Sequence, residues 1–282
     1  MPVIEVEHLV KRYKKAKEPA VKDVSFSVEE GEFFAFLGPN GAGKTTTISI
    51  LTTTLSKTAG RVRIGGYDLD TQERQVRRAI GIIFQRPSLD LTLTAEENIR
   101  IHSCLYGVYP YRPTFGSMPA AYRRQVEELA EVVGLGEALR RPVRKLSGGM
   151  QRKLEVIRSL MHTPRVLFLD EPTSGLDAVA RRNLWDYLNQ VRRDHGTTVF
   201  LTTHYIDEAE DADTVCLINS GLVGLCCPPQ EMKRRLGANR LEDAYVDYLS
   251  QETGEMGTVP ISGGPEIGTV PISAGSRREV AA

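Results

Sequence analysis

The segment GPNGAGKTT, residues 38–46, has the residue types and the spacing of a loop that holds a polyphosphate. It fits the pattern G-x-x-x-x-G-K-[ST], follows an apolar run that ends at Leu37, and precedes a stretch that we predict to be a helix over residues 46–55. Lys44 would add a positive charge for the β and γ phosphates, and Thr45 a hydroxyl for Mg²⁺. Glycines let backbone N–H groups converge on an anion at a helix N-terminus, and here they are Gly38, Gly41 and Gly43.

An acidic pair follows another apolar run, in RVLFLDEP at residues 165–172. The run predicts a buried strand over residues 166–169, with Asp170 and Glu171 at its carboxyl end. Ligands of open α/β sheets bind at that edge, where the Lys44 loop should also lie. We therefore expect Asp170 to hold Mg²⁺, commonly through water, and Glu171 to polarise an attacking water molecule.

Three further residues are candidates for the same site, although their types alone leave two interpretations open. His204 directly follows the apolar stretch TVFLTT and should reach the same edge, but a lone histidine is also common as a hydrogen-bonded structural residue. Gln85 closes IGIIFQ, where its amide could bond either the backbone or a metal-bound water. Tyr13 is equally compatible with an ordinary strand surface.

The segment LSGGMQRKLE, residues 146–155, places a serine and two glycines before a predicted helix. A plain helix start with Ser147 as the N-cap would explain this composition. With Gly148 and Gly149, the segment also offers a second helix N-terminus suited to phosphate. The loop at 38–45 already supplies one phosphate cradle, so a single nucleotide does not need both from one chain. A second chain would resolve the duplication.

Several short apolar runs alternate with helical stretches and predict an α/β fold with a parallel sheet covered on both faces. They span residues 33–37, 80–84, 166–169, 198–203 and 214–218. The opening segments VIEVEHLVKRY and VKDVSFSV alternate apolar with polar residues, as antiparallel strands with one solvated face do. Between about residues 90 and 160 the pattern is helical, which predicts an inserted helical subdomain. Within it, residues 109–122 contain three prolines and predict a loop or an extended insert.

The composition narrows the classes of function. Lys plus Arg and Asp plus Glu both number 36, so the formal charge is zero and no strong global field attracts nucleic acid. No run approaches the ~18 apolar residues of a membrane span, and the N-terminus lacks the features of a secretory signal, so we expect a cytosolic location. The four cysteines lack metal-type spacing, and we expect them to be reduced. Residues 253–282 contain GTVPIS twice and predict a disordered tail.

With these segments in this order, the sequence is similar to the nucleotide-binding subunits of ATP-binding cassette (ABC) transporters over roughly residues 3–235. GPNGAGKTT matches the Walker A motif, VLFLDE the Walker B motif, and LSGGM the family signature. Gln85 matches the Q-loop, SGLD at 174–177 the D-loop, and His204 the switch histidine. Tyr13 falls where the family has an aromatic residue that stacks on adenine.

Two positions depart from the commonest family pattern. Met150 stands where most members have glutamine, as also occurs in the subgroup that resembles daunorubicin-resistance-type and other ABC-2 exporters. Ala178 stands where proline is common. Neither position is a phosphate ligand, so we do not expect loss of activity. The segment LEDAYVDYL, residues 241–249, also resembles the short helix that ends subunits of this kind.

The resemblance implies a P-loop NTPase fold, in which a RecA-like parallel sheet core carries an N-terminal antiparallel β subdomain and the inserted helical subdomain. It implies an ABC ATPase domain over residues 1–236 and a helical extension over 237–252. The implied catalytic residues are Glu171, His204 and Gln85, and the implied Mg²⁺ ligands are Thr45, Gln85 and Asp170. The implied ATP contacts are Tyr13, Gly38, Asn40, Gly41, Gly43, Lys44, Thr45, Thr46, Ser147, Gly148 and Gly149.

The resemblance also implies partners. Two ATPase subunits would face head to tail, with ATP between Lys44 of one chain and the 147–149 segment of the other. A separate transmembrane permease would dock near Gln85, which places the protein at the cytoplasmic face of the cell membrane. We expect an ABC-2-type exporter of drugs, lipids or other small molecules, and no nucleic acid partner. The alternatives are a soluble ABC ATPase that acts on nucleic acid or ribosomes, and a P-loop kinase or solitary NTPase.

Overall fold

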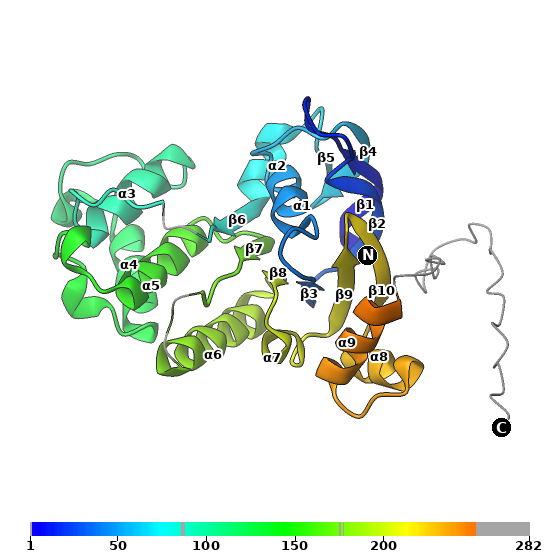
Figure 1. Cartoon of the computed structure of the whole chain (residues 1–282). Helices are drawn as coiled ribbons and strands as arrows, with labels where there is room; N and C mark the ends of the chain where they lie inside the picture. Colours follow the sequence, from blue (N-terminus) through cyan, green and yellow to red (C-terminus); the bar gives the residue numbers. More distant parts are fainter. Residues whose placement is uncertain (1, 86–87, 175, 177, 252–282) are drawn as a thin grey trace, which may run out of the picture.

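A six-stranded sheet forms the centre of the computed structural model, which describes residues 2–85, 88–174, 176 and 178–251 (Figure 1). Its strands are parallel except for the last antiparallel pair, β9 with β10. This arrangement confirms the predicted α/β class. In spatial order the strands are β10 (Leu222–Cys227), β9 (Thr214–Asn219), β3 (Phe33–Leu37), β8 (Thr198–Thr203), β7 (Val166–Asp170) and β6 (Ile80–Ile83).

The strand β3 is buried on both faces and divides the core in two. Side chains of successive strand residues point to opposite faces. Phe33, Ala35 and Leu37 accordingly join the core cluster shared with the helices, and Phe34 and Phe36 join the one shared with the second sheet. Because both faces are covered by apolar groups, every residue of the strand is hydrophobic, as the continuous apolar run predicted.

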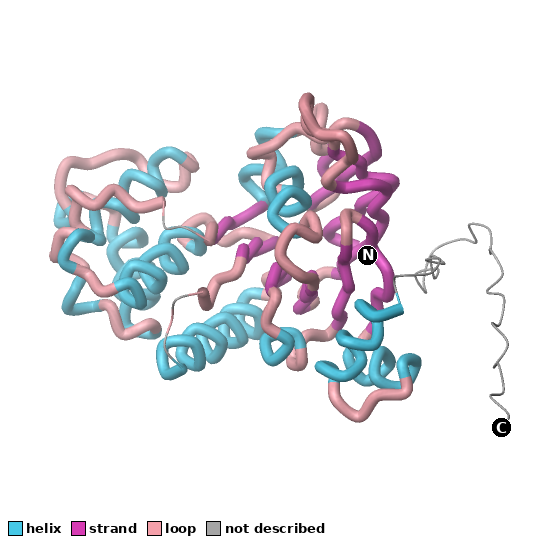
Figure 2. The backbone as a smooth tube through the Cα atoms, viewed as in Figure 1, coloured by secondary structure: helices cyan, strands magenta, loops and turns pink. Residues whose placement is uncertain are grey.

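The second sheet is antiparallel and lies beside the first, at the magenta strands on the right of Figure 2. In spatial order it contains β2 (Val21–Glu29), β1 (Pro2–Lys11), β4 (Ala59–Ile64) and β5 (Tyr67–Asp68). Along β2, buried side chains alternate with more exposed ones, which confirms the prediction of antiparallel strands with one solvated face. Phe26 of β2 stacks on Phe34 of β3 with ring centroids 5.4 Å apart and fastens the two sheets together.

The helix after the phosphate loop, α1 (Lys44–Leu51), is shorter than the sequence predicts. We predicted a helix over 46–55, but the last four residues lie outside it. The hydroxyl of Thr52 donates to Ile48 O at 2.8 Å and that of Thr54 to Ser49 O at 2.8 Å. Threonine hydroxyls compete for helical carbonyls in this way, and Thr53 takes a left-handed φ of 61° that ends the helix.

Three helices between β6 and β7 occupy the region where a helical insertion was predicted, on the left of Figure 1. They are α3 (Ala95–Leu105), α4 (Ala120–Val132) and α5 (Gly148–Leu160), with 3-10 turns at Phe115–Ser117, Gly136–Ala138 and Val143–Lys145. The predicted loop over 109–122 is wrong at its end, because residues 120–122 form the first turn of α4. Tyr122 is fully buried there, and its hydroxyl donates to Glu96 Oε1 at 3.0 Å.

The remaining helices are α2 (Glu73–Ala79), α6 (Ala178–His195), α7 (Ile206–Ala209), α8 (Pro229–Leu236) and α9 (Leu241–Gln251). The helices α8 and α9 pack against each other beside β10 (Figure 1). Within the described part of the chain, no helix is both long enough and apolar enough to span a bilayer. The tail predicted over 253–282 lies outside the described residues.

Candidate nucleotide-binding site

The order of the parallel strands brings the candidate residues to one edge of the large sheet. The strands β3, β8, β7 and β6 are consecutive neighbours, so their carboxyl ends form one row. Leu37 pairs with Thr203, and Asp170 pairs with Thr202, so these strands end at nearly the same level. The segments that follow them are the phosphate loop, His204, Glu171 and Gln85.

The carboxylate of Glu171 lies at the centre of this edge. The amide Nε2 of Gln85 donates to Glu171 Oε2 at 2.9 Å. His204 Nδ1 lies 3.1 Å from Glu171 Oε1, within ion-pair distance though not aligned for a hydrogen bond, and Lys44 Nζ lies 3.9 Å from the same oxygen. Three sequence candidates from three other segments therefore meet around the carboxylate of a fourth, Glu171, which is 9% exposed.

The backbone at Glu171 holds its side chain in this position. Its φ is 46°, in the left-handed region that residues other than glycine rarely adopt. Its N–H donates to Thr202 O at 3.0 Å, so the chain is still bonded to β8 where it leaves β7. Local strain of this kind persists where the surrounding structure over-determines it, and it clusters at functional sites.

Two glycines of the phosphate loop are required by the packing around them. A Cβ on Gly38 would lie 2.1 Å from Ile218 O, and a Cβ on Gly43 would lie 2.7 Å from Ala20 O. Gly43 also has a φ of 106°. The backbone of the loop can therefore lie against β9 and the segment before β2 only with glycine at these two places.

Lys44 is held by the loop that precedes it. Its ammonium donates to Gly38 O at 2.7 Å and to Pro39 O at 3.0 Å. Burial lowers the pKa of Lys44, against the opposing attraction of the Glu171 and Asp170 carboxylates. The amine thus lies at the junction of the phosphate loop and the acidic pair.

Asp170 ends β7 beside this amine, and the hydroxyl of Thr202 donates to its Oδ1 at 2.5 Å. Burial raises the pKa of Asp170, and the neighbouring Glu171 carboxylate raises it further, while the Thr202 hydrogen bond lowers it. A divalent cation would offset this charge repulsion. The hydroxyl of the exposed Thr45 and the amide oxygen of Gln85 are further hard oxygen donors, so the residues present fit Mg²⁺.

Three other candidates, Tyr13, Asn40 and Thr46, lie in or near the phosphate loop. The hydroxyl of Tyr13 lies 3.4 Å from Thr46 Oγ1, and its ring is 44% exposed with Lys11 Nζ 5.5 Å from the ring centroid. Asn40 is exposed at the outer part of the loop. Tyr13 is therefore near the start of α1 and lies just after β1, outside the strands of the antiparallel sheet.

The 147–149 segment is not among the residues that meet at the sheet edge. Ser147 is the N-cap of α5 and accepts a hydrogen bond from Met150 N at 3.3 Å, so the segment does begin a helix, as one of the two interpretations predicted. A Cβ on Gly148 would meet no atom within 4 Å, so the chain itself does not require glycine there. Of the D-loop motif, positions 175 and 177 lie outside the described residues.

One buried cluster next to the site was not anticipated from the sequence. Glu155 of α5 is fully buried and accepts hydrogen bonds from Ser88 N and from Arg152 Nη1, both at 2.9 Å. Arg158 Nη2 lies 3.7 Å from Glu155 Oε1, the oxygen that accepts from Ser88 N. Arg152 Nε donates to Pro172 O at 2.8 Å. The cluster ties α5 to the segments that follow Gln85 and Glu171. Its sequence signal is three charged residues at i, i+3 and i+6 on one helix face.

Comparisons with known proteins identify the family. A family model described as ABC transporter matches residues 21–174, more than half of the chain. The daunorubicin/doxorubicin resistance ATP-binding protein DrrA of Streptomyces peucetius is 40% identical over 253 residues, which cover 89% of this chain and 73% of that protein. The Nod factor export ATP-binding protein I of Ralstonia nicotianae is 40% identical over 221 residues, 78% of this chain and 65% of that protein.

Solved structures agree with the sequence comparisons. The ATP-binding subunit of an ABC transporter superposes with a TM-score of 0.77 at 28% identity, over 88% of this chain and 99% of that one. A dimeric bacterial ABC transporter cassette gives a TM-score of 0.69 at 29% identity, over 79% of this chain and 97% of that one. The chain belongs to the ABC transporter family and is an ATP-binding cassette of that family, with the ATPase fold and the likeness to exporter subunits that its motifs predicted.

We expect Glu155→Gln to destabilise the protein by about 3 kcal/mol, because removing one partner of a buried ion pair leaves the guanidinium groups of Arg152 and Arg158 without their carboxylate. The free energy of unfolding from urea titration measures this effect. Glu73→Gln is the matched control, since it breaks the exposed pair with Arg77 and should cost less than about 1 kcal/mol. Equal losses in the two variants would contradict the structural role of Glu155.

Proposed function

We propose that the chain is the ATP-hydrolysing subunit that powers a membrane exporter of the ABC-2 type. The observation that carries this proposal is the meeting of Gln85, His204 and Lys44 around the buried Glu171 carboxylate, at the sheet edge that also carries the phosphate loop. Such a site has an anion cradle, a cation and a base within a few ångströms. These are the groups that phosphoryl transfer to water needs.

In this proposal the phosphates of ATP lie on the N–H groups of the loop, at the N-terminus of α1. Lys44 exchanges its bonds to Gly38 O and Pro39 O for phosphate oxygens, which its flexible side chain allows. Mg²⁺ supplies charge neutralisation at the phosphates, held by Asp170, Thr45 and Gln85. Further ATP contacts come from Tyr13, Asn40, Gly41, Gly43 and Thr46.

Glu171 is the proposed general base. Its carboxylate already contacts Gln85 and His204, which would keep it oriented and would hold the attacking water on the phosphate side. His204 can move between Glu171 and the terminal phosphate, since its side chain is only partly buried. The left-handed backbone at Glu171 turns the carboxylate out of the strand and toward the loop.

We predict that Glu171→Gln retains ATP binding but lowers the rate of ATP hydrolysis at least about 100-fold, because the amide cannot accept the proton of the attacking water. Phosphate release and nucleotide titration measure the two properties separately. Glu210→Gln, at an exposed carboxylate just after α7, is the control and should leave the rate unchanged. Normal turnover by the Glu171 variant would remove this residue from the proposed mechanism.

We further propose that the active form is a head-to-tail homodimer in which Ser147, Gly148 and Gly149 of one chain contact the ATP held by Lys44 of the other. The exposed Gly148 supports this arrangement. The packing of its own chain does not require glycine there, and a glycine at a helix N-terminus lets a ligand approach the backbone closely. The similarity to a dimeric cassette at 29% identity is consistent with the same arrangement.

Gly148→Ala tests the dimer without disturbing the fold. Its Cβ meets nothing within 4 Å, so the free energy of unfolding should stay the same or rise by up to about 1 kcal/mol. ATP-driven dimer formation, measured by light scattering, and ATP turnover should both fall about tenfold or more, because the methyl group blocks the phosphate. Gly38→Ala is the contrasting variant and should unfold the loop. Full turnover by Gly148→Ala, or by a strict monomer, would exclude the shared site.

A permease surface is proposed at the inserted helices, on the side that carries α3. Five large apolar side chains are exposed at α3 and its flanking loops, and Leu105 is the most exposed at 79%. They are Leu91, Ile101, Leu105, Val108 and Tyr111. We propose that these side chains, which come from one stretch of the chain, form an apolar patch that contacts a partner protein. The patch lies on the segments that follow Gln85, so a permease bound there would be connected to the site through these segments. It would also hold the protein at the cytoplasmic face of the membrane.

The exported substrate is proposed by class. The relatives include daunorubicin/doxorubicin resistance and Nod factor export proteins, so drugs, lipids and other small molecules are the candidates. These likenesses do not favour a soluble ATPase that acts on nucleic acid or ribosomes. We assign the ATPase function to residues 1–236, with the helical insertion at about 90–160, and a separate helical extension to residues 237–252.

Leu105→Asp should abolish co-purification of an integral membrane protein with the tagged chain from detergent-solubilised membranes, because the patch must exclude water to bind. ATP turnover of the isolated chain should be unchanged, since Leu105 is not part of the site. Val246→Asp, at a 54% exposed valine on α9, is the control and should leave the co-purified protein in place. Loss of the membrane protein in both variants, or in neither, would exclude α3 as the docking surface.

A further inference from the structure

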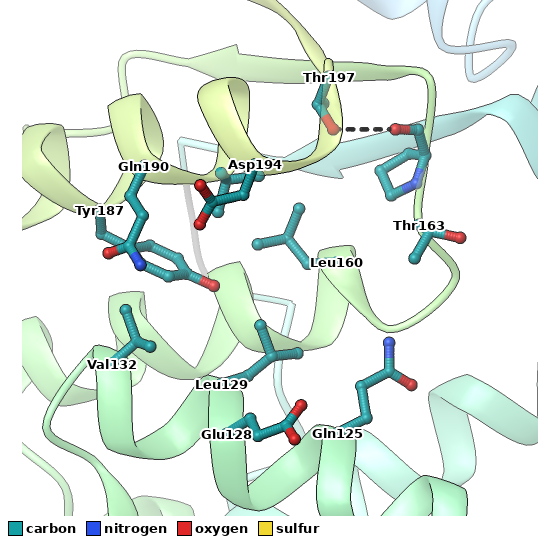
Figure 3. Close-up of a pocket in the computed structure, with 12 residues that line it drawn as sticks. Gln125, Glu128, Leu129, Val132, Leu160, Thr163, Tyr187, Gln190, Asp194 and Thr197 are labelled. Atoms are coloured by element: carbon teal, nitrogen blue, oxygen red, sulfur yellow. Dashed lines mark hydrogen bonds between the residues drawn. The ribbon is translucent and has the colours of Figure 1, made fainter.

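A cavity of about 180 Å³ lies between α4, the end of α5 and α6, away from the sheet edge that carries the candidate site (Figure 3). Its floor is formed by apolar side chains, with Leu129 and Leu160 near its centre and Val191 of α6 beside them. Glu128 lies on the α4 side in Figure 3 and Asp194 on the α6 side, with the leucines between them.

Tyr187 projects its hydroxyl into this cavity, between Leu129 and Leu160 (Figure 3). The residue is only 5% exposed, and the hydroxyl has no hydrogen-bond partner among the described residues. A buried hydroxyl without a hydrogen-bond partner destabilises the folded state, so native proteins rarely leave one unpaired. Leu129 and Leu160 lie on two sides of this oxygen in Figure 3, so a hydrogen-bond partner for it must come from a molecule that enters the cavity.

The charge of the cavity lining selects the kind of ligand. The 12 described residues that line it include two carboxylates, Glu128 and Asp194, and no lysine, arginine or histidine. Neither carboxylate forms an ion pair with another described residue. A neighbouring hollow shares Tyr187 but contains Lys153, so its lining is not purely acidic.

We propose that this cavity binds a linear aliphatic polyamine. Two ammonium groups joined by a methylene chain match two carboxylates that flank an apolar floor, because each charge finds its counterion while the chain covers the leucines. An internal amine, as in spermidine, can donate to the Tyr187 oxygen that otherwise has no partner. The ligand would join α4 of the inserted helices to α6 beside the large sheet.

The proposal is tested by calorimetric titration and thermal unfolding of the full chain with spermidine, putrescine and butylamine, at low salt because the carboxylates are exposed. We expect saturable binding and a rise in Tm with spermidine, weaker effects with putrescine and none with butylamine, which carries one charge. Equal effects of butylamine and the polyamines, or no binding of either polyamine, would overturn the proposal.

Variants locate the site. Glu128→Gln and Asp194→Asn should each weaken spermidine binding about two- to fivefold, and the double variant should weaken it more. Glu127→Gln, an exposed neighbour on α4 outside the cavity lining, is the control and should bind like the parent chain. Binding that survives the double variant, or falls equally in the control, would show a nonspecific surface effect and overturn the assignment.

Tyr187→Phe distinguishes a hydroxyl that is free to bind a ligand from one that already binds a trapped water molecule. If the hydroxyl is unpaired in the free chain, phenylalanine should raise the Tm of the free chain and reduce the preference for spermidine over putrescine. A lower Tm of the free variant with an unchanged preference would mean that water already satisfies the hydroxyl, and it would overturn the role of Tyr187. ATP turnover should be the same in all cavity variants without polyamine, so failure here is distinguishable from failure of the proposed function.

Discussion

The structure depends most on the attraction between one buried carboxylate and the polar groups that reach it from neighbouring strand ends. Glu171 would be costly to bury alone, since an unpaired charge in a low-dielectric region loses its hydration. Gln85, His204 and Lys44 compensate that loss from three different segments. The loops after β6, β8 and β3 are therefore fixed relative to one another by their shared contact with the Glu171 carboxylate.

The large sheet makes this arrangement possible because its strand order differs from its sequence order. The strands β3, β8, β7 and β6 are far apart in the chain but adjacent in space, and they end at one level. The buried Arg152 and Glu155, together with the partly buried Arg158, then connect the inserted helices to the same row of loops. Motion of α5 must consequently move the segments beside Gln85 and Glu171, or break a charged cluster whose carboxylate is fully buried.

Much of the fold follows from local patterns, and the exceptions have physical causes. Continuous apolar runs identified the inner strands, and the alternation in β2 identified an antiparallel strand, because burial on two faces or one imposes those patterns. The end of α1 and the start of α4 were mispredicted: threonine hydroxyls bonded helical carbonyls in one case, and tertiary burial of Tyr122 overrode a proline-rich context in the other.

The candidate site was predictable in part. The phosphate loop and the acidic pair are recognisable because glycine spacing and a strand-terminal position are local properties of the sequence. The roles of Gln85, His204 and Tyr13 stayed ambiguous without the resemblance, because only strand order decides which strand ends are neighbours. The partners of Glu155 were not predictable, since Ser88 N meets it across a long separation in sequence. The cavity at Tyr187 depends on the relative placement of three helices and leaves no motif.

The bonds from Lys44 to Gly38 O and Pro39 O have one more consequence. A cationic side chain that finds acceptors within its own loop keeps that loop folded when no anion is present. In the proposed mechanism, release of the nucleotide would require no rebuilding of the loop, because the amine would return to these two carbonyls. Breaking the same bonds would cost part of the binding free energy, and in exchange the loop would be ready for the next nucleotide.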